Sequence, residues 1–295
     1  MSAPVMSGGL YLNGATIMTT STGRHLEVAR AAGFDGVEVR AERLLDAPEE
    51  LDEAASVVRP GEVWSLNGIQ LQLRPDGGLD RTRFNADLGP RLEVCRRLGA
   101  AYLLVVPPRA AGADRDRAIE AMREGLAVIR DRAASDEIGV AFEFLGFGDC
   151  PIDTPALAGE VVAGLPGVKL VLDSCHWHAS GGGSLASFPI DRLAMVHVND
   201  APAKPPRDIE DADRVLPGLG VVDLAGLVGQ LRSAGYDGPW SLETFNPEYW
   251  SVDPERIARD GRSRLGQVVG QAHGQVLGQA HGEPSRAGGT GPGEA

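Results

Sequence analysis

The chain has 295 residues, of which 43% are hydrophobic and 23% are charged, and its formal net charge is −13. This length is compatible with one large domain, because α/β barrels of about 250 residues or more commonly form a single domain. The negative charge repels phosphate backbones, so a nucleic-acid partner would need a strong local basic patch, and the sequence contains none. We therefore expect no nucleic-acid partner.

The cysteines and the apolar runs bear on the cellular compartment of the protein. Cys95, Cys150 and Cys175 form no Cys-x-x-Cys pair, so free thiols in a reducing compartment are the simpler interpretation. The N-terminus lacks a basic region followed by an apolar stretch, and no apolar run approaches the ~20 residues of a membrane span. We therefore expect a cytoplasmic protein with no membrane partner.

Short apolar segments recur along the chain, and each is followed by a segment with helical periodicity. This alternation is typical of successive strand–helix units in a parallel sheet. The predicted strands are Tyr11–Ile17, Gly36–Arg40, Val63–Leu71, Tyr102–Val106, Val140–Phe144, Lys169–Leu172, Met195–Val198 and Trp240–Glu243. Their spacing of roughly 31 residues is close to the usual length of a βαβ step. The pattern predicts a (β/α)8 barrel over residues 1–269.

A doubly wound open sheet is the main alternative to the barrel. Its glycine-rich fingerprint should follow the first strand, whereas the nearest match, Gly218-Leu219-Gly220, follows a long loop. Amphipathic helices are predicted over Arg83–Leu98 and Arg115–Ala134.

The junctions between helices and strands carry a recurring glycine. Gly33, Gly99 and Gly235 each follow a predicted helix. We expect them to end these helices in the left-handed conformation.

The composition changes near residue 270, where the segment 270–274 (Gly-Gln-Ala-His-Gly) recurs at 278–282. A glycine-rich repeat buries too little surface to order itself firmly. We predict a tail over 270–295, with a frayed helix extension over 270–282 and disorder over 283–295.

Four polar residues end or interrupt the apolar runs of the last four predicted strands: Glu143, Asp173, His197 and Glu243. The active site of such a barrel lies at the C-terminal ends of the strands, so these side chains should converge. Three carboxylates and one imidazole suit one divalent ion, such as Mn²⁺, Mg²⁺, Co²⁺ or Zn²⁺. The alternative is that each acid caps a helix or pairs with an arginine. Buried charges at four strand ends are costly, however, unless they coordinate something.

Several runs of the sequence resemble the xylose isomerase-like superfamily of sugar isomerases and epimerases, and most of all its inosose isomerase family. The matching runs are Gly36–Arg40, Phe142–Gly146, Leu172–His178, Val196–Asp200, Asp213–Gly218 and Leu242–Trp250. The resemblance covers about residues 10 to 265 and implies a TIM barrel with the same four metal ligands. This chain departs from the inosose isomerase pattern at two loop positions, with Leu216 in place of a tryptophan and Asn246 in place of an arginine.

Six further residues are predicted to contact the substrate: His176, Arg214, Glu38, Arg40, Trp177 and His178. Alternatives remain open for each of them. The two histidines and Arg214 could be ordinary loop residues, and Glu38 with Arg40 could form a structural ion pair. Trp177 could simply pack.

The resemblance implies an isomerase or epimerase of a small polyhydroxylated ketone, a keto-cyclitol or a ketose, with inosose as the first candidate. A divalent ion that holds the ketone and a neighbouring hydroxyl acidifies the C–H between them and stabilises an enediolate. Glu143 and Glu243 would act as an acid/base pair, one removing a proton and the other returning it.

Two alternative activities use the same barrel. Loss of a hydroxyl from the enediolate would make the protein a dehydratase of an inosose or of 3-dehydroshikimate. A DNA-repair enzyme like the AP endonucleases would need more histidine ligands and a basic track, and the net charge of −13 opposes it. The sequence leaves open the stereochemistry, the physiological metal and whether the chain forms a homo-oligomer.

Overall fold

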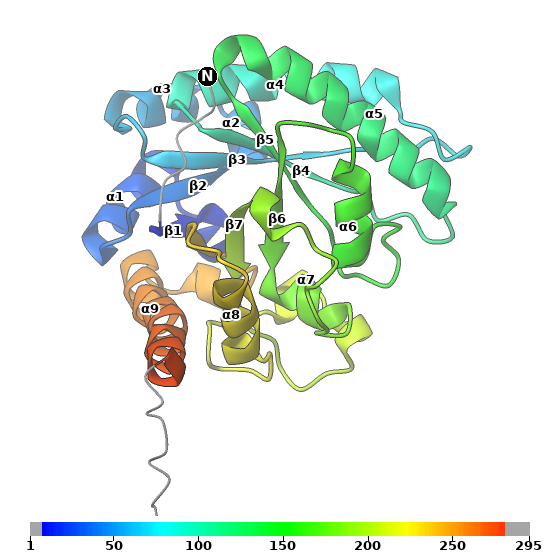
Figure 1. Ribbon diagram of the computed structural model, residues 1–295. Coiled ribbons are helices and arrows are strands. Elements are labelled where there is room, and N and C mark those ends of the chain that lie inside the picture. The colour runs from blue at the N-terminus through cyan, green and yellow to red at the C-terminus, as the bar shows by residue number, and fades with distance from the viewer. Residues whose placement is uncertain (1–7, 281–295) are drawn as a thin grey trace, which may run out of the picture.

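The computed structural model describes the backbone of residues 8–280 and the side chains up to residue 270, and it forms a closed barrel (Figure 1). The strands pair in chain order from β1 to β8, and β8 pairs with β1. Every one of these pairs is parallel. The predicted (β/α)8 TIM barrel is therefore confirmed.

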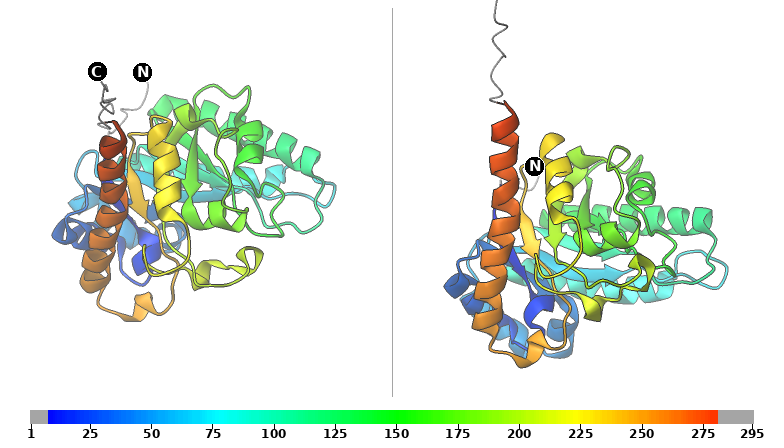
Figure 2. Two further views of the ribbon diagram at one scale, coloured as in Figure 1. Left: turned by 60° about the horizontal axis from the view of Figure 1, so that its bottom comes forward. Right: turned by 90° about the horizontal axis from the view of Figure 1, so that it is seen from below.

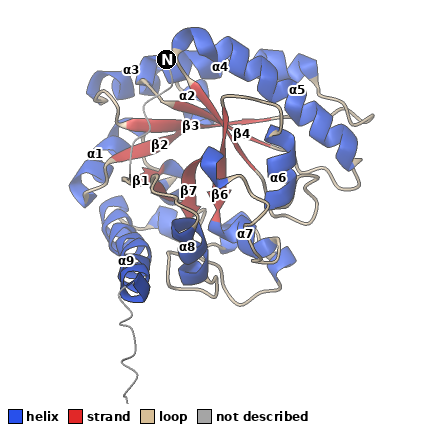
Figure 3. Cartoon of the chain, viewed as in Figure 1, coloured by secondary structure: helices blue, strands red, loops and turns tan. Residues whose placement is uncertain are grey.

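Helices surround the strands on the outside of the barrel (Figure 3). The strands are β1 (Leu10–Asn13), β2 (Gly36–Arg40), β3 (Val63–Gln70), β4 (Tyr102–Val106), β5 (Gly139–Glu143), β6 (Val168–Asp173), β7 (Leu193–Val198) and β8 (Trp240–Leu242). The helices are α1 (Thr22–Ala32), α2 (Ala41–Asp46), α3 (Pro48–Val57), α4 (Arg81–Leu98), α5 (Arg115–Ala133), α6 (Pro155–Val162), α7 (Ser174–Ala179), α8 (Leu224–Ser233) and α9 (Pro254–Ala280). No helix within residues 8–280 is long and apolar enough to cross a membrane.

The first strand is shorter than predicted. The apolar run through Ile17 was expected to be one strand, but β1 ends at Asn13 and residues Gly14–Ile17 form a 3-10 helix. The Asn13 side chain accepts a hydrogen bond from the Ala15 N–H at 3.0 Å, which caps this turn. A side-chain cap thus ends the strand although the hydrophobic pattern continues.

The predicted glycine helix ends are confirmed. Gly33 and Gly99 are the C-caps of α1 and α4, with φ angles of 80° and 64° in the left-handed region. Gly235 follows the C-cap of α8 and has a φ of 87°. The reversed backbone lets each chain segment leave its helix and enter the next strand.

An apolar cluster fills the barrel interior nearer the N-terminal ends of the strands. It consists of Tyr11, Trp64, Tyr102, Leu104, Ala141, Val171 and Met195. Because side chains alternate across a strand, the next inward residue lies two positions further along. That residue is Asp173 after Val171 and His197 after Met195, so a polar layer lies above the apolar one.

Helix α9 closes the ring by packing against α1 and α8 (Figure 2). It continues through the glycine-rich segment to Ala280. The predicted disorder over 283–295 lies outside the described residues.

We predict that Gly146→Ala destabilises the fold, because a Cβ at this position would lie 2.4 Å from the carbonyl oxygen of His176 in α7. Forcing an extra methyl group into such a contact typically costs about 1–3 kcal/mol. Chemical denaturation should therefore show a lower free energy of unfolding. Gly148→Ala in the same loop is the matched control, since a Cβ there meets nothing within 4 Å. Equal stability of the two variants would contradict the packing described.

Candidate metal centre

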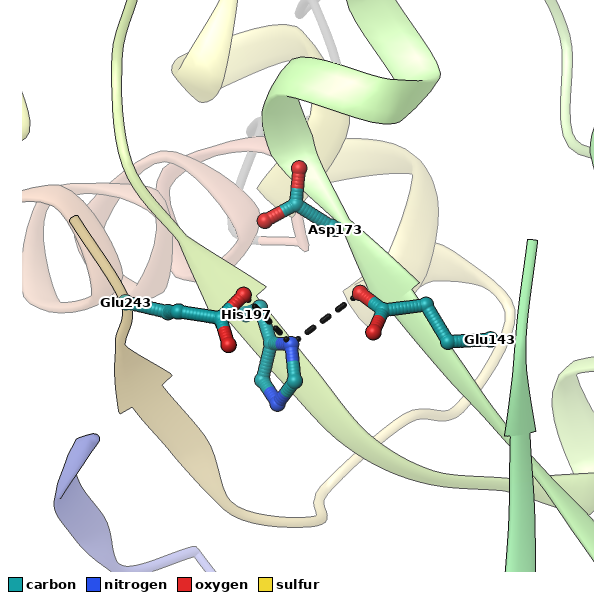
Figure 4. A group of neighbouring side chains, drawn as sticks. All are labelled: Glu143, Asp173, His197 and Glu243. Carbon is teal, nitrogen blue, oxygen red and sulfur yellow. Dashed lines mark hydrogen bonds and ion pairs between the residues drawn. The ribbon is translucent and has the colours of Figure 1, made fainter. Parts of the chain in front are cut away.

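The four residues expected to bind a metal come together at the C-terminal ends of four neighbouring strands (Figure 4). Glu143 and Asp173 are the last residues of β5 and β6, His197 lies near the end of β7, and Glu243 follows β8. All four side chains are buried, and one ligand atom from each lies within 4.8 Å of those of the others.

The donor atoms fit a divalent ion. The Nδ1 atom of His197 lies 3.1 Å from Glu143 Oε1 and 3.1 Å from Glu243 Oε2. Metal–ligand bonds of about 2.0 to 2.3 Å allow ligand atoms on opposite sides of an ion to be roughly twice that far apart. Three carboxylates with one imidazole nitrogen therefore match the size and chemistry of a single ion.

Burial and neighbouring charges act differently on the two glutamates. Burial is the main cause that raises the pKa of Glu143 to about 7, and the charges of Glu243 and Asp173 raise it further. Burial also acts to raise the pKa of Glu243, but the positive charges of His197 and Arg214 outweigh it and lower this pKa to about 2. Two carboxyl groups whose pKa values are shifted in opposite directions are suited to act as an acid and a base.

Glu38 lies beneath the four residues and not at the substrate cavity. Its side chain is fully buried, and its carboxylate oxygen lies 3.1 Å from His197 Nε2. The Ser65 hydroxyl donates to the same carboxylate at 2.7 Å, and the Asn13 amide donates at 3.3 Å. Because Glu38 holds Nε2, the Nδ1 atom of His197 is left to face the three other ligands.

Three asparagines that the sequence analysis did not single out support the carboxylates. The side-chain amides of Asn13 and Asn67 donate to Glu243 Oε1 at 2.9 and 3.2 Å. The Asn199 amide donates to Asp173 Oδ2 at 2.6 Å. Each asparagine lies two positions after an inward-facing residue, so strand alternation was the signal that could have found them.

A cavity of about 270 Å³ opens beside these residues. Of the predicted substrate contacts, Arg40, His176 and Arg214 line it. Arg40 pairs with Glu42 at 3.3 Å instead of with Glu38, and its guanidinium carbon lies 5.1 Å from the centroid of the Phe245 ring.

Arg214 is the cation in closest contact with the four residues within the described chain. Its guanidinium lies 3.3 Å from Asp173 and 3.4 Å from Glu243, and it is buried. It also lies 3.0 Å from His176 Nε2. Arg214 and His176 thus form the wall of the cavity next to the carboxylates.

The structure does not bring the other two predicted contacts to the cavity. Trp177 is buried in the hydrophobic core, and its indole N–H donates to the Gly183 carbonyl at 2.9 Å. His178 is half-buried on α7 and does not line the cavity.

A second hollow of about 190 Å³ lies at the opposite end of the barrel, where Lys169, Tyr102 and Pro239 line it. It contains none of the residues expected to bind metal or substrate. The cavity beside Glu143 and Glu243 is therefore the candidate site.

Comparisons with known proteins place the chain in a family. The sequence profile of the family described as xylose isomerase-like TIM barrel matches residues 26–268, so the chain belongs to that family. An inosose isomerase of Bacillus licheniformis is 29% identical over 88% of this chain and 97% of its own length. A 3-dehydroshikimate dehydratase of Pseudomonas aeruginosa is 30% identical over 81% of this chain, which spans 38% of that protein.

A solved structure supports the same placement. A crystal structure of an IOLI protein with a bound zinc atom superposes with a TM-score of 0.80 at 26% identity. The match covers 90% of this chain and 99% of that one. The barrel is therefore shared over almost its whole length.

We predict that the protein binds one equivalent of Co²⁺ and that His197→Ala weakens this binding. Loss of the hydrogen-bond partner of a ligand typically lowers metal affinity roughly 10- to 100-fold, and we expect loss of the ligand itself to lower it further. Isothermal titration calorimetry measures both variants, with His178→Ala as the matched control because His178 lies outside the cluster. Co²⁺ binding that survives unchanged in His197→Ala would rule out this ligand set.

Glu38→Gln provides a separate prediction about the layer beneath the site. A glutamine can present its N–H₂ group to His197 Nε2, which favours the wrong tautomer of the imidazole. We expect Co²⁺ affinity to fall roughly 10- to 100-fold. Glu42→Gln, at the cavity rim and 55% exposed, should keep wild-type affinity. A Glu38→Gln protein with unchanged affinity would show that the imidazole is held in place by other contacts.

Proposed function

We propose that this member of the xylose isomerase-like TIM barrel family is a divalent-metal-dependent isomerase of a small polyhydroxylated ketone, with an inosose as the first candidate substrate. The observation that carries the proposal is the convergence of Glu143, Asp173, His197 and Glu243 within 4.8 Å beside a cavity. The similarity to inosose isomerases supports the substrate class.

The bound ion would act as a Lewis acid on the ketone oxygen and a neighbouring hydroxyl of the substrate. The protein's own groups then move the proton. Glu143 and Glu243 approach from opposite sides of His197, as Figure 4 shows. The Glu243 carboxylate removes a carbon-bound proton, and the Glu143 carboxyl group on the other side of the site returns a proton to the neighbouring carbon.

The cavity wall would hold the substrate during this transfer. Arg214 and His176 offer hydrogen bonds to hydroxyl or ketone oxygens at the edge of the carboxylate cluster. Phe147 and Phe245 supply apolar surface that excludes water from the same cavity. Asn67 lies at the cavity and keeps Glu243 oriented through its amide.

A dehydratase is the second candidate function, and the similarity to 3-dehydroshikimate dehydratases favours it. The same proton removal followed by loss of a hydroxyl on the adjacent carbon would give an enone and water. The chain spans 38% of the length of those relatives.

Turnover in D₂O tests the isomerase proposal. Inososes, ketohexoses and 3-dehydroshikimate are incubated with the Mn²⁺-loaded protein and followed by NMR. We expect an isomeric ketone with deuterium on the carbon beside the carbonyl, because the proton that Glu143 returns comes from a carboxyl group that exchanges with water. A product with conjugated-enone absorbance would assign the dehydratase, and product without deuterium would exclude transfer through an exchanging carboxylate.

The roles of the two glutamates give a further expected outcome. Glu143→Gln and Glu243→Gln each keep an oxygen for the metal but remove a base. At saturating Mn²⁺ we expect kcat to fall at least about 100-fold in both, because one general base contributes about 10²- to 10⁴-fold. Glu248→Gln, in the exposed loop after β8, is the matched control. Near wild-type turnover by either variant would show that this glutamate takes no part in proton transfer and serves only as a ligand.

A further inference from the structure

Asp200 is a buried acid that the proposed chemistry does not use. It lies two residues beyond β7 and is 1% exposed. No ion pair joins it to a lysine, arginine or histidine within the described residues, so its charge must be stabilised in another way.

Backbone amides provide that stabilisation. Asp200 Oδ1 accepts from the N–H groups of Ala201 and Val222, both at 2.9 Å. Asp200 Oδ2 accepts from Gly218 at 3.0 Å and from Gly220 at 2.9 Å. A buried carboxylate whose lone pairs accept four hydrogen bonds costs little to bury. The loop over residues 215–222 is therefore folded around this one side chain.

Arg214 directly precedes this loop. The backbone of Asp200 pairs with Val215 in both directions, with N···O distances of 2.9 and 2.8 Å. On the other side, the Asn246 amide donates to the Arg214 carbonyl at 2.8 Å. The backbone that presents the Arg214 guanidinium is thus held between Asp200 and Asn246.

An electrostatic argument explains why this anchoring matters. The carboxylates of Asp173 and Glu243 attract the Arg214 guanidinium at 3.3 and 3.4 Å. A divalent cation at the same carboxylates would offset this attraction and repel the guanidinium. The Asp211 carboxylate, which is 2.7 Å from the guanidinium and is not one of the four ligands, would still attract it. The backbone anchors, which do not depend on these charges, would hold the main chain of Arg214 at the cavity.

We propose that Asp200 is a positioning residue that keeps Arg214 against the metal centre when the ion is bound. This inference rests on the proposed metal-dependent function. It implies that residues 214–222 are already in place before the substrate binds. Asp200 acts through Arg214 and touches neither the substrate nor the metal.

The test measures the dissociation constant for Co²⁺ by calorimetry in Asp200→Asn, Arg214→Met and the double variant. Removing a cation next to the ligands should tighten binding about tenfold or more. Asp200→Asn should tighten it as well by releasing Arg214, and the double variant should bind no more tightly than Arg214→Met. Loss of the Asp200 charge alone would weaken binding, so the direction separates the two effects.

Gly220→Ala tests the same contact without a change of charge. A Cβ at residue 220 would lie 2.1 Å from the Ala201 carbonyl oxygen and 2.4 Å from Asp200 Oδ1, so the loop must move. Gly220→Ala should also tighten Co²⁺ binding. It replaces Asp200→Asn in the test if that variant does not fold. Asp223→Asn, which keeps an N-cap side chain on α8, should leave the affinity unchanged.

Several outcomes would overturn the inference. These are unchanged affinity in Arg214→Met, unchanged or weaker affinity in both Asp200→Asn and Gly220→Ala, or full additivity in the double variant. Hydrogen exchange adds a readout that needs no metal affinity: Asp200→Asn should speed amide exchange over 215–222, and unchanged exchange there would also refute the role. Absence of Co²⁺ binding by the wild type, with faster exchange in Asp200→Asn, would instead reject the proposed function.

Discussion

The central constraint on this structure is the burial of three carboxylates at one end of a barrel. Glu143, Asp173 and Glu243 are almost fully enclosed, and isolated charges in such a place would be strongly unfavourable. The chain offsets the cost with His197, with Arg214 and with asparagine amides. A divalent ion would complete this compensation, which is the physical reason for treating the cluster as a metal centre.

Strand alternation explains how one barrel holds both an apolar interior and a charged site. Ala141, Val171 and Met195 face inward within the apolar cluster, and the residues two positions later form the polar layer. The apolar cluster supports the ligands from below and keeps water away from that side. A one-residue shift of any of these strands would move a ligand to the helix-facing side.

The sequence was sufficient for the barrel and for the convergence of four residues, because each of these ends or interrupts a clear apolar run. It was insufficient where a polar residue has more than one compatible partner. Glu38 was predicted to contact substrate, but its place one layer lower emerges only from the closed barrel, where His197 from β7 lies against it. Trp177 was also predicted to contact substrate, but it lies in the hydrophobic core. The sequence could not indicate this, because the face that a six-residue helix buries depends on its tertiary neighbours.

The division between strands and loops separates the chemistry from the choice of substrate. The four candidate ligands lie on or directly after strands, whereas His176 and Arg214 come from the segments beyond them. The two loop positions at which the sequence analysis expects a departure from the inosose isomerase pattern, Leu216 and Asn246, lie close to Arg214. Asn246 donates to the Arg214 carbonyl, and the Leu216 N–H donates to the Tyr249 hydroxyl at 3.3 Å. Substitutions at these two loop positions would therefore alter the support of a cavity residue while leaving the four candidate ligands in place.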